Sequence, residues 1–163
     1  MKYMRFTAIC LTLLGIISIS ASCGGPAKEA DALLTTFGTV SGVVVKYNQI
    51  IDGESVTPES FEIQGKIITS LFVSDSNPFK KDAGKQEKAG ENNGHYVIIF
   101  VKDDPSAGVI YAPIEISLGD EAPKVDVRIK QIAPVNTAAG KVIEPWDEEI
   151  VTKKSFFVAG GPA

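Results

Sequence analysis

The sequence predicts an all-β domain, an antiparallel β-sandwich that follows a leader and a short tether. Two observations indicate this fold class. After residue 38, several runs rich in valine, isoleucine and phenylalanine alternate between two faces, which is typical of strands with one buried face. In the same region no helical apolar stripe exceeds two turns, so the sequence offers no crossover helices for a parallel sheet.

The first residues are typical of a secretory leader. Lys2 and Arg5 give a positive start, and residues 6–19 then form an uncharged run of 14 residues. As a helix, this run would cover about 21 Å, whereas the hydrocarbon core of a bilayer is about 30 Å thick. The run is therefore short for a membrane span and has the length of a signal-peptide core.

The segment around Cys23 resembles a bacterial lipoprotein signal. Small residues at 20–22 lead directly to Cys23, and two glycines and a proline follow at 24–26. The resemblance implies that residues 1–22 are a lipoprotein signal peptide and that lipid on Cys23, including palmitate, anchors the protein, with the outer membrane of the cell envelope as its expected place. Ser20 departs from the leucine usual at that position. The alternative is an ordinary signal peptide, which would give a secreted protein.

Charge and cysteine content argue against several kinds of site. Removing the leader takes away Lys2 and Arg5 and no acidic residue, so the net charge falls from −4 to −6. An acidic domain is a poor partner for nucleic acid. The cysteines are Cys10 in the leader and Cys23, so we expect no disulfide, no zinc site and no thiol nucleophile. We also expect no cofactor and no other metal.

Composition divides the rest of the chain into three parts. Residues 23–38 are predicted to be a flexible tether, because glycine, proline, alanine and charged residues follow one another there without a period. Residues 39–159 are predicted to form the β-sandwich domain, and residues 160–163 a linker-like tail. The clearest predicted strands lie at 43–47, 67–73, 96–101, 125–130 and 156–158.

Two of these strands differ from the others in pattern. The runs 67–73 and 96–101 are apolar on both faces, which predicts that both are central strands. By contrast, Val127 and Ile129 alternate with charged residues and indicate one buried face. The polar residues 74–95 between the two apolar runs predict a mobile loop.

A polar turn is predicted where the chain passes from one strand to the next at 56–61. Pro58 fixes φ at about −65°, which suits the first position of a helical turn. Thr57 can cap this turn. Phe61 and Ile63 then return to the core.

Several blocks, taken in order, resemble the immunoglobulin-like N-terminal domain of bacterial secreted esterases. They are a Val-x-Tyr strand end at 45–47, the turn block at 51–61, a Gly-x-Tyr-Val strand start at 94–97 and a closing Ser-Phe-Phe-Val at 155–158. The resemblance covers about residues 39–159 and implies an Ig-like antiparallel β-sandwich. No G-x-S-x-G nucleophile motif occurs in the sequence, so the esterase chemistry is not carried over.

The sequence therefore predicts a non-catalytic accessory or interaction module of a cell-envelope lipoprotein, and we do not expect an enzyme. The expected partners are the membrane, through the lipid anchor, and a hydrolase or another envelope protein. A truncated esterase and a free-standing module both remain open, and so do the oligomeric state and the ligand.

The remaining candidate residues favour structural roles. His95 is the only histidine and stands at the entrance to a strand, where a triad or zinc site would lack partners. Asp103 and Asp104 are interpreted as turn residues rather than calcium ligands. Trp146 lies among acidic residues, and with Tyr111 it is a candidate contact for a glycan or surface polymer, the alternative function. A competing interpretation folds Trp146 onto the sandwich.

Overall fold

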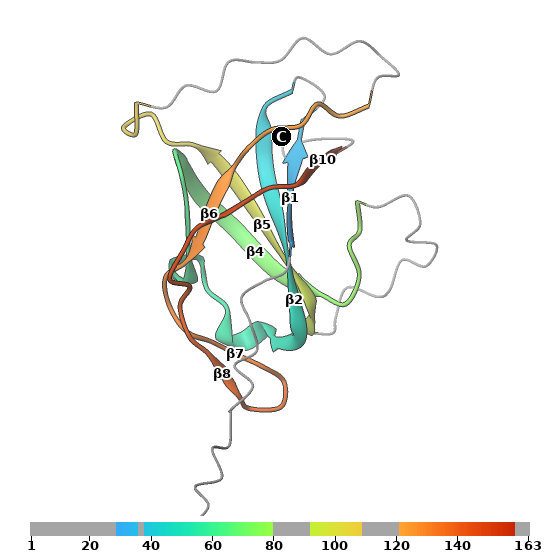
Figure 1. Ribbon diagram of the computed structural model, residues 1–163, viewed down its shortest axis with the longest axis vertical. Coiled ribbons are helices and arrows are strands. Elements are labelled where there is room, and N and C mark those ends of the chain that lie inside the picture. Colours follow the sequence, from blue (N-terminus) through green and yellow to red (C-terminus); the bar gives the residue numbers. More distant parts are fainter. Residues whose placement is uncertain (1–28, 36–37, 80–91, 109–120, 159–163) are drawn as a thin grey trace, which may run out of the picture.

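The structure, a computed structural model, is an all-β sandwich in which two short 3₁₀ turns are the only helical elements among the described residues (Figure 1). It describes residues 29–35, 38–79, 92–108 and 121–158. Within these ranges no helix is long and apolar enough to cross a membrane.

The strands of the described residues form three sheets. The largest has five strands in the order β10-β1-β2-β5-β4, a second contains β3, β6 and β9, and β7 and β8 form a small third sheet. The elements are β1 (Glu29–Leu34), β2 (Val40–Asp52), η1 (Gly53–Ser55), η2 (Pro58–Ser60), β3 (Phe61–Ile63), β4 (Lys66–Ser74), β5 (Asn93–Asp103), β6 (Arg128–Gln131), β7 (Val135–Asn136), β8 (Val142–Ile143), β9 (Ile150–Val151) and β10 (Lys154–Phe157).

The first strand corrects the predicted tether. Instead of a flexible segment up to residue 38, the chain forms β1 between β2 and β10, so the domain begins earlier than predicted. This strand pairs antiparallel with β2 and parallel with β10. Because side chains cover both of its faces, Leu33 and Leu34 are both fully buried, and no period-two pattern marks the strand in the sequence. Residues 23–28 of the predicted tether lie outside the described residues.

The two runs with apolar residues on both faces occupy different places in the large sheet. The prediction for 96–101 is confirmed, since β5 pairs with β2 on one side and with β4 on the other. The prediction that 67–73 is central is wrong, because β4 lies at the edge of the sheet that the described residues form. The strand is apolar on both sides because one side faces the main core and the other belongs to a second apolar surface, on the outer face of the sheet. Because β5 starts at Asn93, the predicted loop ends earlier, and its residues 80–91 lie outside the described ranges.

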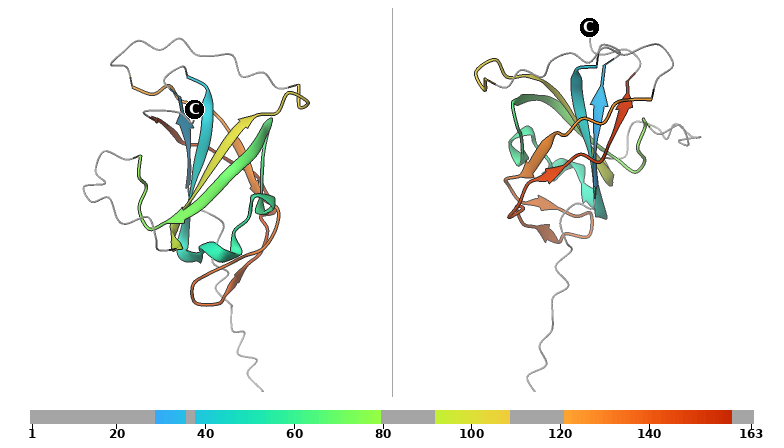
Figure 2. Two further views of the ribbon diagram at one scale, coloured as in Figure 1. Left: turned by 180° about the vertical axis from the view of Figure 1, so that it is seen from behind. Right: turned by 45° about the horizontal axis from the view of Figure 1, so that its top comes forward.

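The main core lies between the five-stranded sheet and the second sheet. In Figure 1 the strand β6 crosses in front of the large sheet, and the views in Figure 2 show the same layering. Alternate residues of β2 and β5 point into this space and meet residues of β3 and β6. The central ones are Val43, Val45, Val97, Ile99, Phe61, Ile63 and Ile129. Each of these side chains contributes about 1.5–3 kcal/mol when fully buried.

The turn predicted before β3 has the expected form. Pro58 starts η2, the backbone N–H of Thr57 donates to the Ser60 hydroxyl at 3.1 Å, and the N–H of Ser60 donates to the Thr57 carbonyl at 2.9 Å. These bonds satisfy the turn locally and aim the following strand inward. Phe61 and Ile63 are accordingly buried, as predicted.

One buried amide connects the two layers. Gln131 of β6 accepts a hydrogen bond from the Tyr47 hydroxyl of β2 at 2.8 Å. Its Nε2 donates to the carbonyl oxygens of Ala133, Ile143 and Glu144. A fully buried amide needs such partners, because an unsatisfied polar group inside the core is costly. Gln131 therefore fixes how β6 and the segment around β8 lie against β2.

Candidate interaction surface

His95, the only histidine of the chain, is the residue that a catalytic triad would require. His95 lies in β5 and is half-buried. None of the side-chain hydrogen bonds or ion pairs found among the described residues involves His95. A nucleophile, a base and an orienting acid need mutual contact for triad chemistry. The part of the chain that the structure describes contains no such arrangement around its histidine.

The acidic residues considered as calcium ligands have other partners. Asp103 forms an ion pair with Lys66. The Asp104 carboxylate accepts hydrogen bonds from the backbone N–H and the hydroxyl of Ser106, and these bonds lower its pKa. No group of three or more histidine, cysteine, aspartate or glutamate residues is arranged for a metal ion within the described ranges. Asp104 thus acts as a turn cap.

One of the two candidate glycan contacts, Trp146, is not exposed at the surface. Trp146 is only 5% exposed and packs against Tyr47 and Phe61, with ring centroids 6.1 and 6.3 Å away. The interpretation that folds Trp146 onto the sandwich is therefore confirmed, and its role as a glycan contact is wrong, because a stacking platform needs an exposed ring. Tyr111 and Cys23 lie outside the described residues.

A shallow hollow lies between the η2–β3 segment and the start of β4. Its lining combines apolar side chains from both layers with Glu59 and Glu62. Glu59 is exposed, and hydrogen bonds from its own backbone and from Thr57 lower its pKa. The hollow is open to solvent rather than enclosed, so it lacks the features of a small-molecule site.

The outer face of the five-stranded sheet is the unusual surface of this domain. A second apolar cluster lies there, on the side opposite to the main core. Leu33, Val44 and Ile98 form its buried centre. The partly buried side chains packed on them are Phe79, Tyr96, Phe100, Phe156 and Val158.

Neighbouring strands extend this apolar surface toward the β4 edge. Phe72 is 45% exposed, and its ring lies 6.1 Å from that of Phe100. Lys46 holds its ammonium 5.8 Å from the centre of the Tyr96 ring. A sheet with one face on the core and one in water normally alternates apolar and polar side chains. Here both faces are apolar, although the second sheet covers only one of them.

Comparison with known proteins agrees with this architecture. A family model described as "Esterase Ig-like N-terminal domain" matches residues 35–144. The chain belongs to this family. The match begins just after β1 and ends before β9 and β10, so the Ig-like domain as folded is longer than the matched segment at both ends. No curated protein matches the sequence.

A solved structure supports the same fold. The Ig-like domain is similar to a chain described as "Crystal Structure of a Thermostable Esterase", with a TM-score of 0.58 and 20% sequence identity. The match covers 80% of the present chain and 36% of that chain. This chain therefore corresponds to about a third of that esterase, and at this level of identity the likeness concerns the fold alone.

The apolar outer face left a pattern in the sequence, namely runs that are apolar on both faces. This pattern was interpreted as the mark of central strands. The runs 67–73 and 96–101 carry the outward residues Phe72, Ile98 and Phe100 between inward ones. An apolar outer face and a central position in a sheet both produce an unbroken apolar run, so the pattern alone cannot separate them.

Proposed function

We propose that this chain is a non-catalytic Ig-like module that binds an esterase-type hydrolase domain and holds it at the bacterial cell envelope. The observation that carries the binding role is the apolar outer face of the five-stranded sheet. A face with several aromatic side chains is stabilised when a partner removes it from water.

The choice of partner rests on the family and on the solved neighbour. The family is described as an N-terminal domain of esterases, and the thermostable esterase has additional chain beyond the part that resembles this domain. A hydrolase domain on the same polypeptide or on a separate one would suit this face equally well. The two cases differ in the reading frame: a frame that continues into a hydrolase indicates one polypeptide, and a separate hydrolase gene beside it indicates two.

The binding role is tested with the full chain and the purified hydrolase encoded beside or after it. Phe156→Glu places a charge on the outer face, and we expect it to weaken binding at least tenfold by isothermal titration calorimetry. Val142→Glu is the matched control, because Val142 is 49% exposed on β8, away from this face. Equal binding by both variants, or no binding by the parent chain, contradicts the proposal.

The non-catalytic part of the proposal is tested separately. It is supported by the lack of partners around His95 in the described residues and by the absence of a G-x-S-x-G motif from the sequence. We expect the full chain to leave short-chain p-nitrophenyl esters unhydrolysed above the buffer rate. Hydrolysis that copurifies with the chain and disappears in His95→Ala would overturn this part.

The anchoring part rests on Cys23 and its neighbours in the sequence. Because β1 starts at Glu29, five residues lie between Cys23 and the first strand, which limits the distance between the Cα atoms of Cys23 and Glu29 to about 20 Å. The module would thus work close to the membrane surface. Metabolic labelling with palmitate should mark the parent chain and not Cys23→Ser. An unlabelled parent chain recovered from the medium would support the secreted alternative.

A further inference from the structure

Among the described residues, the outer edge of β4 pairs with no other strand, and only its start lies near η2 and β3. The strand pairs with β5 on one side, and along its other side the described residues place no strand. With Lys66–Ser74 it is also long for an edge strand, at 9 residues. An open edge presents unpaired backbone N–H and C=O groups that another strand can pair with.

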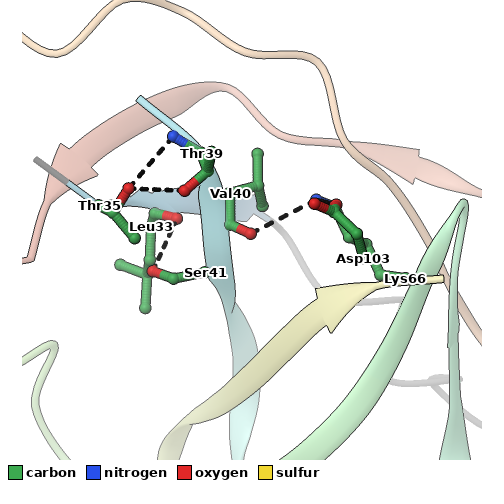
Figure 3. Close-up of polar contacts among 7 residues, drawn as sticks. All are labelled: Leu33, Thr35, Thr39, Val40, Ser41, Lys66 and Asp103. Atoms are coloured by element: carbon green, nitrogen blue, oxygen red, sulfur yellow. Dashed lines mark hydrogen bonds and ion pairs between the residues drawn. The ribbon is translucent and has the colours of Figure 1, made fainter. Parts of the chain in front are cut away.

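Most devices that protect such an edge are missing from β4. Natural sheets block edges with charged residues or proline, yet residues 67–74 contain neither. The one charge in the strand belongs to Lys66, whose side chain is fully buried and forms an ion pair with Asp103 (Figure 3). One irregularity remains, a bulge at Thr69, and its hydroxyl donates to the Phe100 carbonyl of β5 at 3.1 Å.

Two large apolar side chains on β4 are exposed, and they point to the same face. Phe72 pairs with Ile98 of the outer cluster. Ile67 pairs with Lys102, the neighbour of the inward-facing Val101, and so also lies on the outer face. The exposed fractions of Ile67 and Phe72 are 39% and 45%. They flank the exposed polar pair at 69–70 on either side.

We propose that β4 pairs antiparallel with β4 of a second copy of this chain, about a two-fold axis beside Thr69 and Ser70. In this register Ile67 of one copy lies opposite Phe72 of the other, and the same contact occurs twice. Directly opposite residues in an antiparallel pair share a face and come into contact. The two five-stranded sheets then become one continuous sheet of ten strands.

The pattern of β4 favours a second copy over a foreign strand. A two-fold interface must be complementary to itself. Residues 67–72 of β4 carry no charge. Two apolar residues stand at each end of this segment and two polar residues at its centre, so the pattern is the same in both directions along the strand. The Thr69 bulges of both copies lie at the centre, which keeps Ile67 and Phe72 on matching faces on either side of it. No like charges approach one another along this segment.

Disulfide cross-linking tests the register directly. The background is the full chain in detergent with Cys10→Ser and Cys23→Ser, which leaves no other thiol and no lipid. On this background, a mixture of Ile67→Cys and Phe72→Cys chains should form a covalent dimer under mild oxidation. Ile67→Cys alone should not, because the two cysteines would be about 17 Å apart along the strands. A self-cross-link of Phe72→Cys that exceeds the mixed one would overturn this register.

Association itself is measured by analytical ultracentrifugation on the same background. The parent should sediment as a dimer at micromolar concentration, and Ser70→Lys, which adds a charge at the exposed centre of the edge, should weaken the dimer at least tenfold. Val142→Lys is the matched control and should leave the dimer intact. Circular dichroism verifies that each variant is folded. A monomeric parent at tens of micromolar, or a dimer unaffected by Ser70→Lys, overturns the proposal.

Phe72 borders both surfaces, but the dimer is tested at the β4 edge and hydrolase binding at the other edge of the sheet. Phe156 lies on β10 at the opposite edge of the sheet from β4. We therefore expect Phe156→Glu to keep the dimer and Ser70→Lys to keep hydrolase binding. Loss of both properties in either variant would show that the two surfaces are not separate and would contradict the edge register.

Discussion

The ammonium of Lys66 forms an ion pair with the Asp103 carboxylate and joins the first residue of β4 to the last residue of β5. The Lys66 side chain is fully buried, whereas that of Asp103 is 59% exposed. The same ammonium donates to the Val40 carbonyl at 3.4 Å, at the start of β2 (Figure 3). The buried ammonium of Lys66 thus connects the ends of β4, β5 and β2, which are adjacent in the sheet.

This arrangement predicts unequal effects of removing the two partners. Asp103→Ala removes a counter-charge from a fully buried ammonium and should lower the free energy of unfolding by about 1–3 kcal/mol. Lys66→Met removes the buried charge and keeps the aliphatic volume, so its cost should be smaller. Urea unfolding of both variants and of the double variant measures the difference. A double variant no more stable than Asp103→Ala would contradict this account.

A second prediction concerns stability at alkaline pH. Burial raises the pKa of the Tyr47 phenol, which keeps the neutral form in the folded protein. In the unfolded chain the phenol ionises with a pKa of about 10. Its contribution to stability is therefore complete below that pH and is lost above it, by about 1.4 kcal/mol per pH unit until the folded pKa is reached.

The variant Tyr47→Phe isolates this group from the other groups that titrate in the same range. We expect its free energy of unfolding to fall less steeply than that of the parent between about pH 10 and pH 11. At neutral pH the variant should lose about 1–2 kcal/mol, since the Gln131 amide oxygen loses its partner. Parallel slopes for the two proteins above pH 10 would show that the phenol ionises in the folded state.

Two glycines should respond differently to alanine. A Cβ at Gly42 would stand 2.6 Å from the Ile99 carbonyl oxygen and 3.1 Å from Leu33 Cδ1, inside the large sheet. Gly42→Ala should therefore cost about 2–3 kcal/mol or more. At Gly140 the surrounding space is open and only the φ of +78° is unfavourable, so Gly140→Ala should cost about 1 kcal/mol. Denaturant unfolding that ranks Gly140→Ala as the more damaging variant would contradict this packing.

Strands with one buried face and one solvent-exposed face could be predicted from the sequence. Val127 and Ile129 alternate with charged residues, and the structure buries them as expected. The turn at Pro58 was also predictable, because proline and its flanking hydroxyl residues determine local geometry. In both cases the deciding interactions lie within a few residues along the chain.

Long-range contacts were not predictable in the same way. The first strand, β1, is buried only because β2, β10 and residues of both apolar clusters surround it, and the residues that supply this cover are distant in sequence. The position of β4 at the edge likewise depends on which strands pair, and its own residues do not reveal this. The candidate interaction surface was missed for this reason, since it combines residues from several strands of the large sheet.

Trp146 provides a further prediction, because it is the only tryptophan in the chain. Its ring is buried between Tyr47 and Phe61, so the native fluorescence should be blue-shifted and should move to longer wavelength on unfolding. Trp146→Ala should cost about 3–5 kcal/mol in the free energy of unfolding. A native emission maximum typical of tryptophan in water would contradict the buried position.

The final prediction concerns where the folded unit begins. A chain that starts at residue 35, where the family match begins, lacks β1 and with it four buried apolar residues, Ala30, Ala32, Leu33 and Leu34. It also leaves β2 and β10 without the strand that lies between them in the sheet. We expect this chain to lack a cooperative thermal transition, whereas a chain that starts at residue 24 should keep the transition of the parent. Leu33→Ala gives an intermediate test, with an expected loss of about 2–5 kcal/mol. If the chain from residue 35 melts at the parent's temperature, β1 contributes nothing to the fold, and the assignment of Glu29 as its first residue is wrong.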